Sequence, residues 1–141
     1  MYKHILLPVD LEAAASSAQA IEAAVAQAQT SGATLHVMTV VPDYGMSVVV
    51  SFFPDDFAQK ALTETAKQLA AYVAANVPAG VTVQQIVAHG RIYDEIIKAA
   101  DSTGADLIVI SAHRPDVSDY LLGSNAARVA RHAKKSVLII R

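Results

Sequence analysis

The sequence predicts a single α/β domain in which helices cover both faces of a doubly wound, five-stranded parallel sheet. Three observations lead to this class. Short apolar runs alternate with longer segments of helical periodicity, apolar residue types make up 53% of the 141 residues, and no internal repeat or linker divides the chain. Strands and helices that alternate in this way build βαβ units around a parallel sheet.

The first half of the chain predicts two strands, at residues 3–9 and 34–41, and two helices, at residues 16–31 and 57–77. Both strand segments are apolar runs too short for a helix and suit strands that are buried on both faces. The first helix repeats apolar residues at helical spacing, and Gly32 follows it at a C-cap position. The second helix carries a longer apolar stripe.

The second half continues the alternation. Its strands are expected at residues 81–88, 106–111 and 136–140, and its helices at residues 92–103 and 123–133. Gly90 ends the first of these strands and Gly104 closes the following helix. Because crossovers between parallel strands are right-handed, few arrangements remain, and the strand order 3-2-1-4-5 is predicted.

Composition and charge narrow the function classes. The net charge is −2, which gives no reason to expect nucleic acid as a partner. The basic cluster at residues 128–135 sits at the end of a predicted helix, where cations complement the helix dipole. The chain has no cysteine and no apolar stretch near the roughly 20 residues that span a bilayer, so a soluble, cytoplasmic protein is expected. The histidines do not have metal-ligand spacing.

The predicted strand order points to one edge of the sheet. Ligands of doubly wound sheets bind beyond the carboxyl ends of the strands, where the winding reverses, and here that point lies between the first and fourth strands. The residues just past those strands are Pro8, Val9 and Asp10, and Ser111 to Arg114. A carboxylate at Asp10 could accept a ribose hydroxyl or coordinate Mg²⁺ bound to phosphates. It could equally satisfy backbone N–H groups of its own loop.

The segment from Ser111 to Asn125 (SAHRPDVSDYLLGSN) carries the most chemistry. It leaves a buried strand and ends in Gly123, Ser124 and Asn125 at the start of a helix, whose exposed N–H groups attract anions. His113 and Arg114 add donors, and Arg114 is a permanent cation suited to phosphate. The alternative is an ordinary helix cap, with Arg114 paired to Asp116 at the surface.

Several segments together resemble the universal stress protein family over essentially the whole chain. They are ILLPVD, ATLHVMTVV, HGRIYDEIIKAA, ADLIVISAHR, LLGSNAARV and SVLIIR, in the family's order, and the C-terminal half looks most like the F/G-type branch. The resemblance implies a Rossmann-like fold, frequent dimerisation and, in many members, ATP binding. It also implies that Pro8, Val9 and Asp10 flank base and ribose, that Val40 lies against adenine, and that Gly90 lines the pocket.

The family's ATP-binding signature, G-x2-G-x9-G-[ST], is only partly present. Aligned with it, Ser111 and Arg114 replace the first two glycines, Gly123-Ser124 match the last pair, and the loop is one residue short. Ser111 and Arg114 bring side chains where many members have none. Arg114 could contact phosphate directly, or it could occupy the site.

Two further segments suggest contacts beyond the nucleotide. Residues 42–56 are strongly apolar for a connection, and could cover the ligand, pack against another subunit or fold back on their own domain. Residues 136–140 predict a wholly apolar edge strand, and such edges pair with other strands. We therefore expect a homodimer through this edge, the alternative being a loop that covers it.

These residues favour a nucleotide-binding stress-response module with no dedicated catalytic residues. Two alternatives remain at the level of sequence: a slow ATPase or phosphotransferase, for which no base–nucleophile pair is evident, and a dimeric scaffold that has lost its nucleotide. The expected ligand is ATP, ADP or AMP, with Mg²⁺ held through the nucleotide by Asp10.

Overall fold

A computed structural model describes residues 1–42, 56–112 and 123–141. Its five parallel strands have the order β3-β2-β1-β4-β5, which confirms the predicted topology. The strands are β1 (His4–Pro8), β2 (Thr34–Pro42), β3 (Val83–Gly90), β4 (Leu107–Ser111) and β5 (Ser136–Ile140). The helices are α1 (Ala18–Ser31), α3 (Asp56–Asn76), α4 (Ile92–Thr103) and α5 (Ser124–His132), with a short 3-10 helix η1 (Leu11–Ser17).

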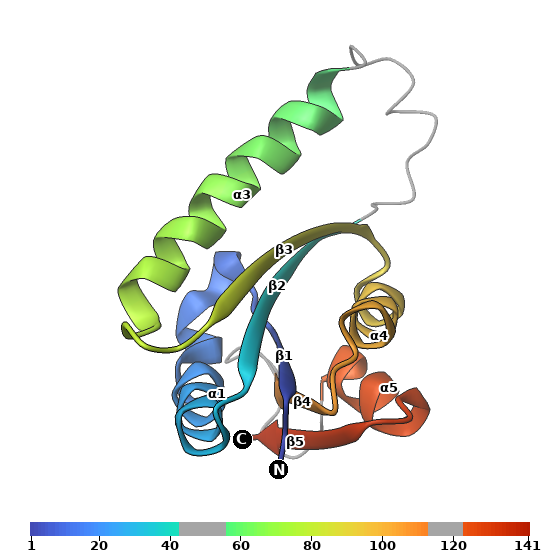
Figure 1. The fold of residues 1–141 in the computed structure, drawn as a ribbon. Coiled ribbons are helices and arrows are strands. Elements are labelled where there is room, and N and C mark those ends of the chain that lie inside the picture. Colours follow the sequence, from blue (N-terminus) through green and yellow to red (C-terminus); the bar gives the residue numbers. More distant parts are fainter. Residues whose placement is uncertain (43–55, 113–122) are drawn as a thin grey trace.

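The helices form a layer on each side of the sheet (Figure 1). On the face of α1 and α3, the core is built from Ile5, Leu7, Leu35, Val37 and Val109, together with Leu69 of α3 and small residues of α1. On the face of α4 and α5 it is built from Leu6, Met38, Ile108 and Ile110, with Ile96 and Val129 from the helices. Successive strand residues thus point to opposite faces, and both faces are apolar because both are covered.

The boundaries agree with the sequence pattern to within one residue at most elements, whereas β3 begins and ends two residues later than expected and α1 begins two residues later. The helix expected from residue 16 begins at Ala18, and the preceding residues form η1, which the Ala-rich pattern did not reveal. Asp10 caps η1, since its Oδ1 accepts a hydrogen bond from the backbone N–H of Glu12 over 3.0 Å. At the other end of α1, Gly32 has φ +69°, a left-handed conformation that a residue with a side chain rarely adopts.

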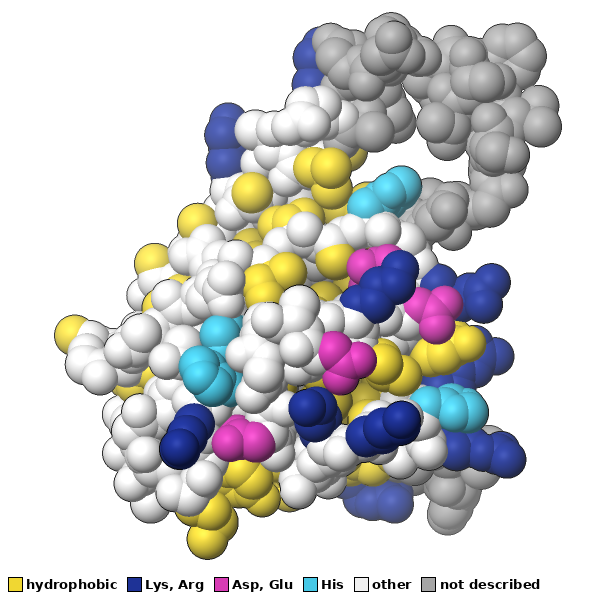
Figure 2. Space-filling view, turned by 45° about the vertical axis from the view of Figure 1, so that its right-hand side comes forward, with side chains coloured by type: hydrophobic (Ala, Val, Ile, Leu, Met, Phe, Trp, Pro, Cys, Tyr) yellow, Lys and Arg dark blue, Asp and Glu magenta, His cyan; other side chains and the backbone are white. Residues whose placement is uncertain are grey.

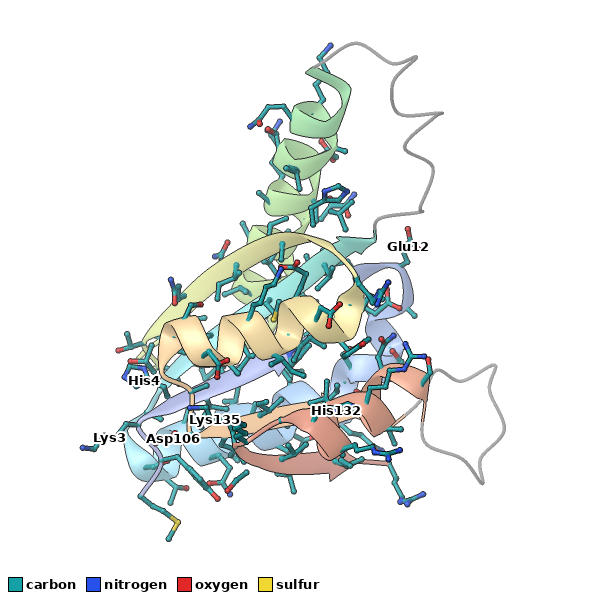
Figure 3. The ribbon with its side chains drawn as sticks, turned by 90° about the vertical axis from the view of Figure 1, so that its right-hand side faces the viewer. Lys3, His4, Glu12, Asp106, His132 and Lys135 are labelled. Carbon is teal, nitrogen blue, oxygen red and sulfur yellow. The ribbon has the colours of Figure 1, made fainter. Side chains whose placement is uncertain are left out.

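The two ends of the sheet have different polar chemistry. At the amino end, the Asp106 carboxylate accepts hydrogen bonds from the backbone N–H groups of Lys3 and His4, which tie β1 to the start of β4. Figure 3 shows Lys3, His4 and Asp106 gathered there, with Glu12 at the opposite end. The carboxyl end holds Asp10, Val40 and Ser111, so the two clusters are separated by the length of the strands.

The helices of the described residues include none that is long and apolar enough to cross a membrane. Figure 2 shows lysine and arginine side chains interspersed with acidic ones over one face of the molecule. Two ion pairs among the described residues lie along α4: Arg91 pairs with Asp94, and Lys98 pairs with Glu95.

Candidate functional site

A cavity of about 600 Å³ lies at the carboxyl edge of the sheet. Its lining comes from the ends of β1, β2 and β4, from η1, and from α3, α4 and α5. This is the position beyond the strands where doubly wound sheets bind ligands, and the volume lies within the roughly 300–1,000 Å³ of small-molecule sites. The fold therefore produces one polar-rimmed pocket where the strand order predicts it.

The end of β1 supplies the floor of this cavity. Pro8, Val9 and Asp10 all line it. The backbone of Val9 is held on two sides, because its N–H donates to the Met38 carbonyl over 2.8 Å and its carbonyl accepts the Thr39 hydroxyl over 3.0 Å. Thr39 is buried, so this contact fixes the end of β1 against the end of β2. Asp10 thus leaves the sheet from a rigid support.

The carboxylate of Asp10 accepts a hydrogen bond within its own loop and also lines the cavity. The bond from the Glu12 N–H is the local contact that the sequence offered as the alternative to ligand binding. The two interpretations are compatible, because a carboxylate has two oxygens and about four acceptor positions. The cap fixes the direction of the side chain while it lines the cavity.

The end of β4 explains one departure from the glycine signature. Ser111 lines the cavity, and its hydroxyl donates a hydrogen bond to the Ser16 carbonyl of η1 over 2.8 Å. A serine at a signature glycine position therefore joins two elements of the rim. Ser16 and Ser17 also line the cavity, and neither was among the predicted site residues, because the Ala-rich sequence around them gave no sign of η1.

The start of α5 forms the opposite wall, with Gly123, Ser124 and Asn125. The Gly123 N–H donates to the Ala112 carbonyl over 2.5 Å, and its carbonyl accepts the Ala127 N–H over 2.9 Å. The next N–H groups, at Ser124 to Ala126, belong to the first turn and have no partner within the helix, and no side chain of the N-cap residue satisfies them. The partial positive charge of this helix end faces the cavity rim.

The remaining predicted residues divide into three cases. Val40, at the end of β2, lines the cavity. Gly90 is not among the lining residues; it has φ +145°, and a Cβ there would lie 2.8 Å from Oε1 of Glu95. His113 and Arg114 lie outside the described residues, as does most of the apolar segment 42–56. In the described part of the chain, no three His, Asp or Glu side chains are grouped as metal ligands.

Comparison with known proteins decides the family. The model of the universal stress protein family matches residues 1–141. The chain belongs to the universal stress protein family. The universal stress protein G of Shigella flexneri is 34% identical over 143 residues, with all of both chains covered.

Solved structures of the family share the fold of this universal stress protein. That of a Methanocaldococcus jannaschii protein superposes with a TM-score of 0.81 at 27% identity, covering 99% of this chain and 96% of the other. A universal stress protein solved in complex with cAMP has a TM-score of 0.63 at 25% identity, covering 99% and 97%. The resemblance stated from the sequence motifs is thus confirmed.

Proposed function

We propose that this universal stress protein binds ATP or a related adenine nucleotide in the cavity at the carboxyl edge, and that occupancy regulates its stress-response partners. One observation carries the proposal: a single cavity joins Asp10 to the uncapped start of α5. A nucleotide needs an apolar place for the base, an acceptor for ribose and donors for phosphate. Val40, Asp10 and the Gly123–Asn125 turn are those three kinds of group in one space.

The phosphate end is best assigned to α5. Its first-turn N–H groups have no intrahelical partner and present the positive end of the helix dipole, which suits an anion. Gly123 contributes no side chain, so a phosphate can approach the backbone closely. A triphosphate carries more charge than one helix end can neutralise, and we assign the additional cation to Arg114, with Mg²⁺ held through the nucleotide by Asp10.

A relative supports the choice of ligand. A universal stress protein of the same fold was solved in complex with cAMP, which is an adenine nucleotide. Here the serine at the first glycine position turns its hydroxyl to the Ser16 carbonyl. Because this hydrogen bond holds the Ser111 side chain at the rim, we propose that the cavity still has room for a nucleotide.

The test is calorimetric titration of the protein with ATP, ADP, AMP and adenosine, each with and without Mg²⁺, after mass spectrometry for nucleotide carried over from expression. We expect micromolar binding that weakens as phosphates are removed. No binding of any of these, with no co-purified nucleotide, would contradict the proposal and favour the nucleotide-free scaffold. Release of phosphate at a rate proportional to protein would favour the slow ATPase instead.

We also propose that the protein acts as a homodimer, in the cytoplasm, through the edge strand β5. β5 is the edge strand, because it pairs with β4 on one side and with no described strand on the other. Its apolar side chains are half-buried in one chain, namely Val137, Leu138, Ile139 and Ile140. Strand pairing across that edge would satisfy its outward backbone groups and cover these side chains. Sedimentation velocity should give a dimer, and exchange of the β5 amides should slow as protein concentration rises. A monomer at all concentrations would contradict the assignment.

A further inference from the structure

The cavity has a part to which the proposed nucleotide site assigns no role. Two side chains of α3, Thr65 and Gln68, also line it. They come from the helix between β2 and β3, whereas the Gly123–Asn125 turn leads from β4 toward β5. In the order β3-β2-β1-β4-β5 these two walls stand at opposite ends of the edge, with β1 between them. The α3 wall is therefore the far end of the cavity from α5.

Charge gives the cavity a direction. The α5 end presents first-turn N–H groups that have no partner within the helix, together with the positive end of the helix dipole. The other end includes the carboxylate of Glu12, from η1, and η1 packs against α3. Figure 3 shows Glu12 near the end of β2. A phosphate beside Glu12 would meet a like charge, so a nucleotide lies with its phosphates at α5 and its base toward α3.

The polar groups at the α3 end are few. The Thr39 hydroxyl donates its hydrogen to the Val9 carbonyl, so it holds β1 and β2 together and has no donor left for a ligand. On α3, the Thr63 hydroxyl donates to the Gln59 carbonyl four residues earlier. Over the described ranges 1–42, 56–112 and 123–141, no such bond engages the side chains of Thr65 and Gln68. The two donors and the acceptor of the Gln68 amide are thus available at the α3 wall of the cavity.

An amide in this place can distinguish purines. The Hoogsteen edge of adenine presents the N6 amino donor beside the N7 acceptor, whereas guanine presents two acceptors, O6 and N7. A glutamine amide offers one acceptor and two donors, and pairs with both atoms of the adenine edge. Against guanine its carbonyl oxygen would face an acceptor.

We propose that Gln68, assisted by the Thr65 hydroxyl, recognises the base end of the bound nucleotide and sets the preference for adenine over guanine. The inference rests on the proposed nucleotide site and adds a base-reading wall from α3. It assigns no role to the phosphate end, so the two ends can be tested separately. Because Gln68 is exposed in the protein without a ligand, its substitution removes no core packing.

The test compares binding of ATP, GTP and AMP by calorimetry in the wild type and in Gln68→Ala and Thr65→Ala. Two variants on the same helix serve as matched controls, Gln59→Ala and Thr63→Ala, because neither residue lines the cavity. For Gln68→Ala we expect ATP binding about tenfold weaker, an ATP-to-GTP preference reduced by a similar factor, and an unchanged ATP-to-AMP ratio. Thr65→Ala should give a smaller loss with the same selectivity pattern.

The outcomes separate this inference from the proposed function. A wild type that binds ATP and GTP equally, or a Gln68→Ala variant with unchanged ATP-to-GTP preference, would overturn the base-reading role and leave the nucleotide site in place. The same loss in Gln59→Ala would also overturn it, since the effect would then belong to the helix and not to the wall. A wild type that binds none of the three nucleotides would overturn both.

Discussion

The Ser111 hydroxyl donates a hydrogen bond to the Ser16 carbonyl over 2.8 Å, across 95 positions of sequence. Ser111 is the last residue of β4 and Ser16 lies in η1, so this contact joins the two sides of the cavity rim. The residue that departs from the family's glycine signature has thus acquired a structural contact. Its side chain joins β4 to η1 at the rim of the cavity.

Removing that contact should cost stability. In Ser111→Ala the Ser16 carbonyl loses its partner, and we expect the free energy of unfolding to fall by about 1 kcal/mol, the usual net value of one hydrogen bond. Urea denaturation measures the change. Ser102→Ala is the control, because the Ser102 hydroxyl donates over 3.3 Å within its own helix and is exposed. Equal losses in the two variants would contradict a special role for the rim contact.

Gly123→Val should abolish nucleotide binding and leave the fold intact. Gly123 has φ −58° and ψ 150°, which any residue adopts, so its backbone does not require glycine. The valine side chain would instead block the close approach of phosphate to the start of α5. Calorimetry with ATP and far-UV circular dichroism check the two halves of this prediction. Ala130→Val, at an exposed site on the same helix, should bind normally.

Two substitutions at Asp10 separate its roles. Asp10→Asn retains an oxygen for the Glu12 N–H but loses the charge, so we expect stability to be kept and the Mg²⁺ dependence of ATP binding to be lost. Asp10→Ala should lose both, with a decrease in stability of about 1 kcal/mol for the missing cap. Titration of both variants with ATP, with and without Mg²⁺, measures the metal dependence, and urea denaturation measures their stability. Unchanged Mg²⁺ dependence in Asp10→Asn would remove the metal role.

Arg114→Ala should weaken the binding of ATP more than that of adenosine. Arg114 lies outside the described residues, and the expectation rests on its charge and its position in the sequence after β4. A guanidinium near phosphate contributes more as the ligand's charge increases. The measurement is the ratio of ATP to adenosine affinity in variant and wild type. Equal losses for both ligands would exclude a phosphate contact.

Stability should fall on mild acidification because of His36. Its Nδ1 donates to Oε1 of Gln84, and its Nε2 lies 3.0 Å from Nδ1 of His4. Burial, with a smaller contribution from the charge of His4, lowers the pKa of His36 below its ordinary 6.5, although the Gln84 bond opposes this. Between the lowered pKa and 6.5 the unfolded chain binds more protons than the folded one, so stability decreases as pH falls through that window.

Urea midpoints between pH 8 and pH 5 measure this dependence. His36→Leu should be less stable at neutral pH but show a flatter pH profile below 6.5. His89→Gln, at an exposed position of β3, is the control, and the same flattening in that variant would contradict the assignment to His36. At lower pH Asp106 adds to the loss. Partial burial opposes its ionisation, but the backbone N–H groups of Lys3 and His4 outweigh it and lower the pKa below 3.8.

The sequence by itself determined the fold and the edge of the sheet at which the cavity opens. Apolar runs such as 136–140 and helix stops such as Gly104 are local signals, and right-handed crossovers convert their order into one strand arrangement. Because the carboxyl ends of parallel strands meet at one edge, Asp10 and Ser111 could be assigned to a common site from their positions, and the family resemblance added Val40. The structure brings these three residues together in the cavity.

Only the tertiary structure decided which other side chains reach that cavity. Ser16 comes from an Ala-rich stretch and Gln68 from an amphipathic helix. Neither sequence pattern indicates whether a polar side chain points to solvent or into a cavity, and both residues line this one. The hydrogen bond from Ser111 to Ser16 depends on how η1 turns back over β4, which no local periodicity encodes. Contacts between residues far apart in sequence are set by packing, and it is packing that determines the rim and the α3 wall of this site.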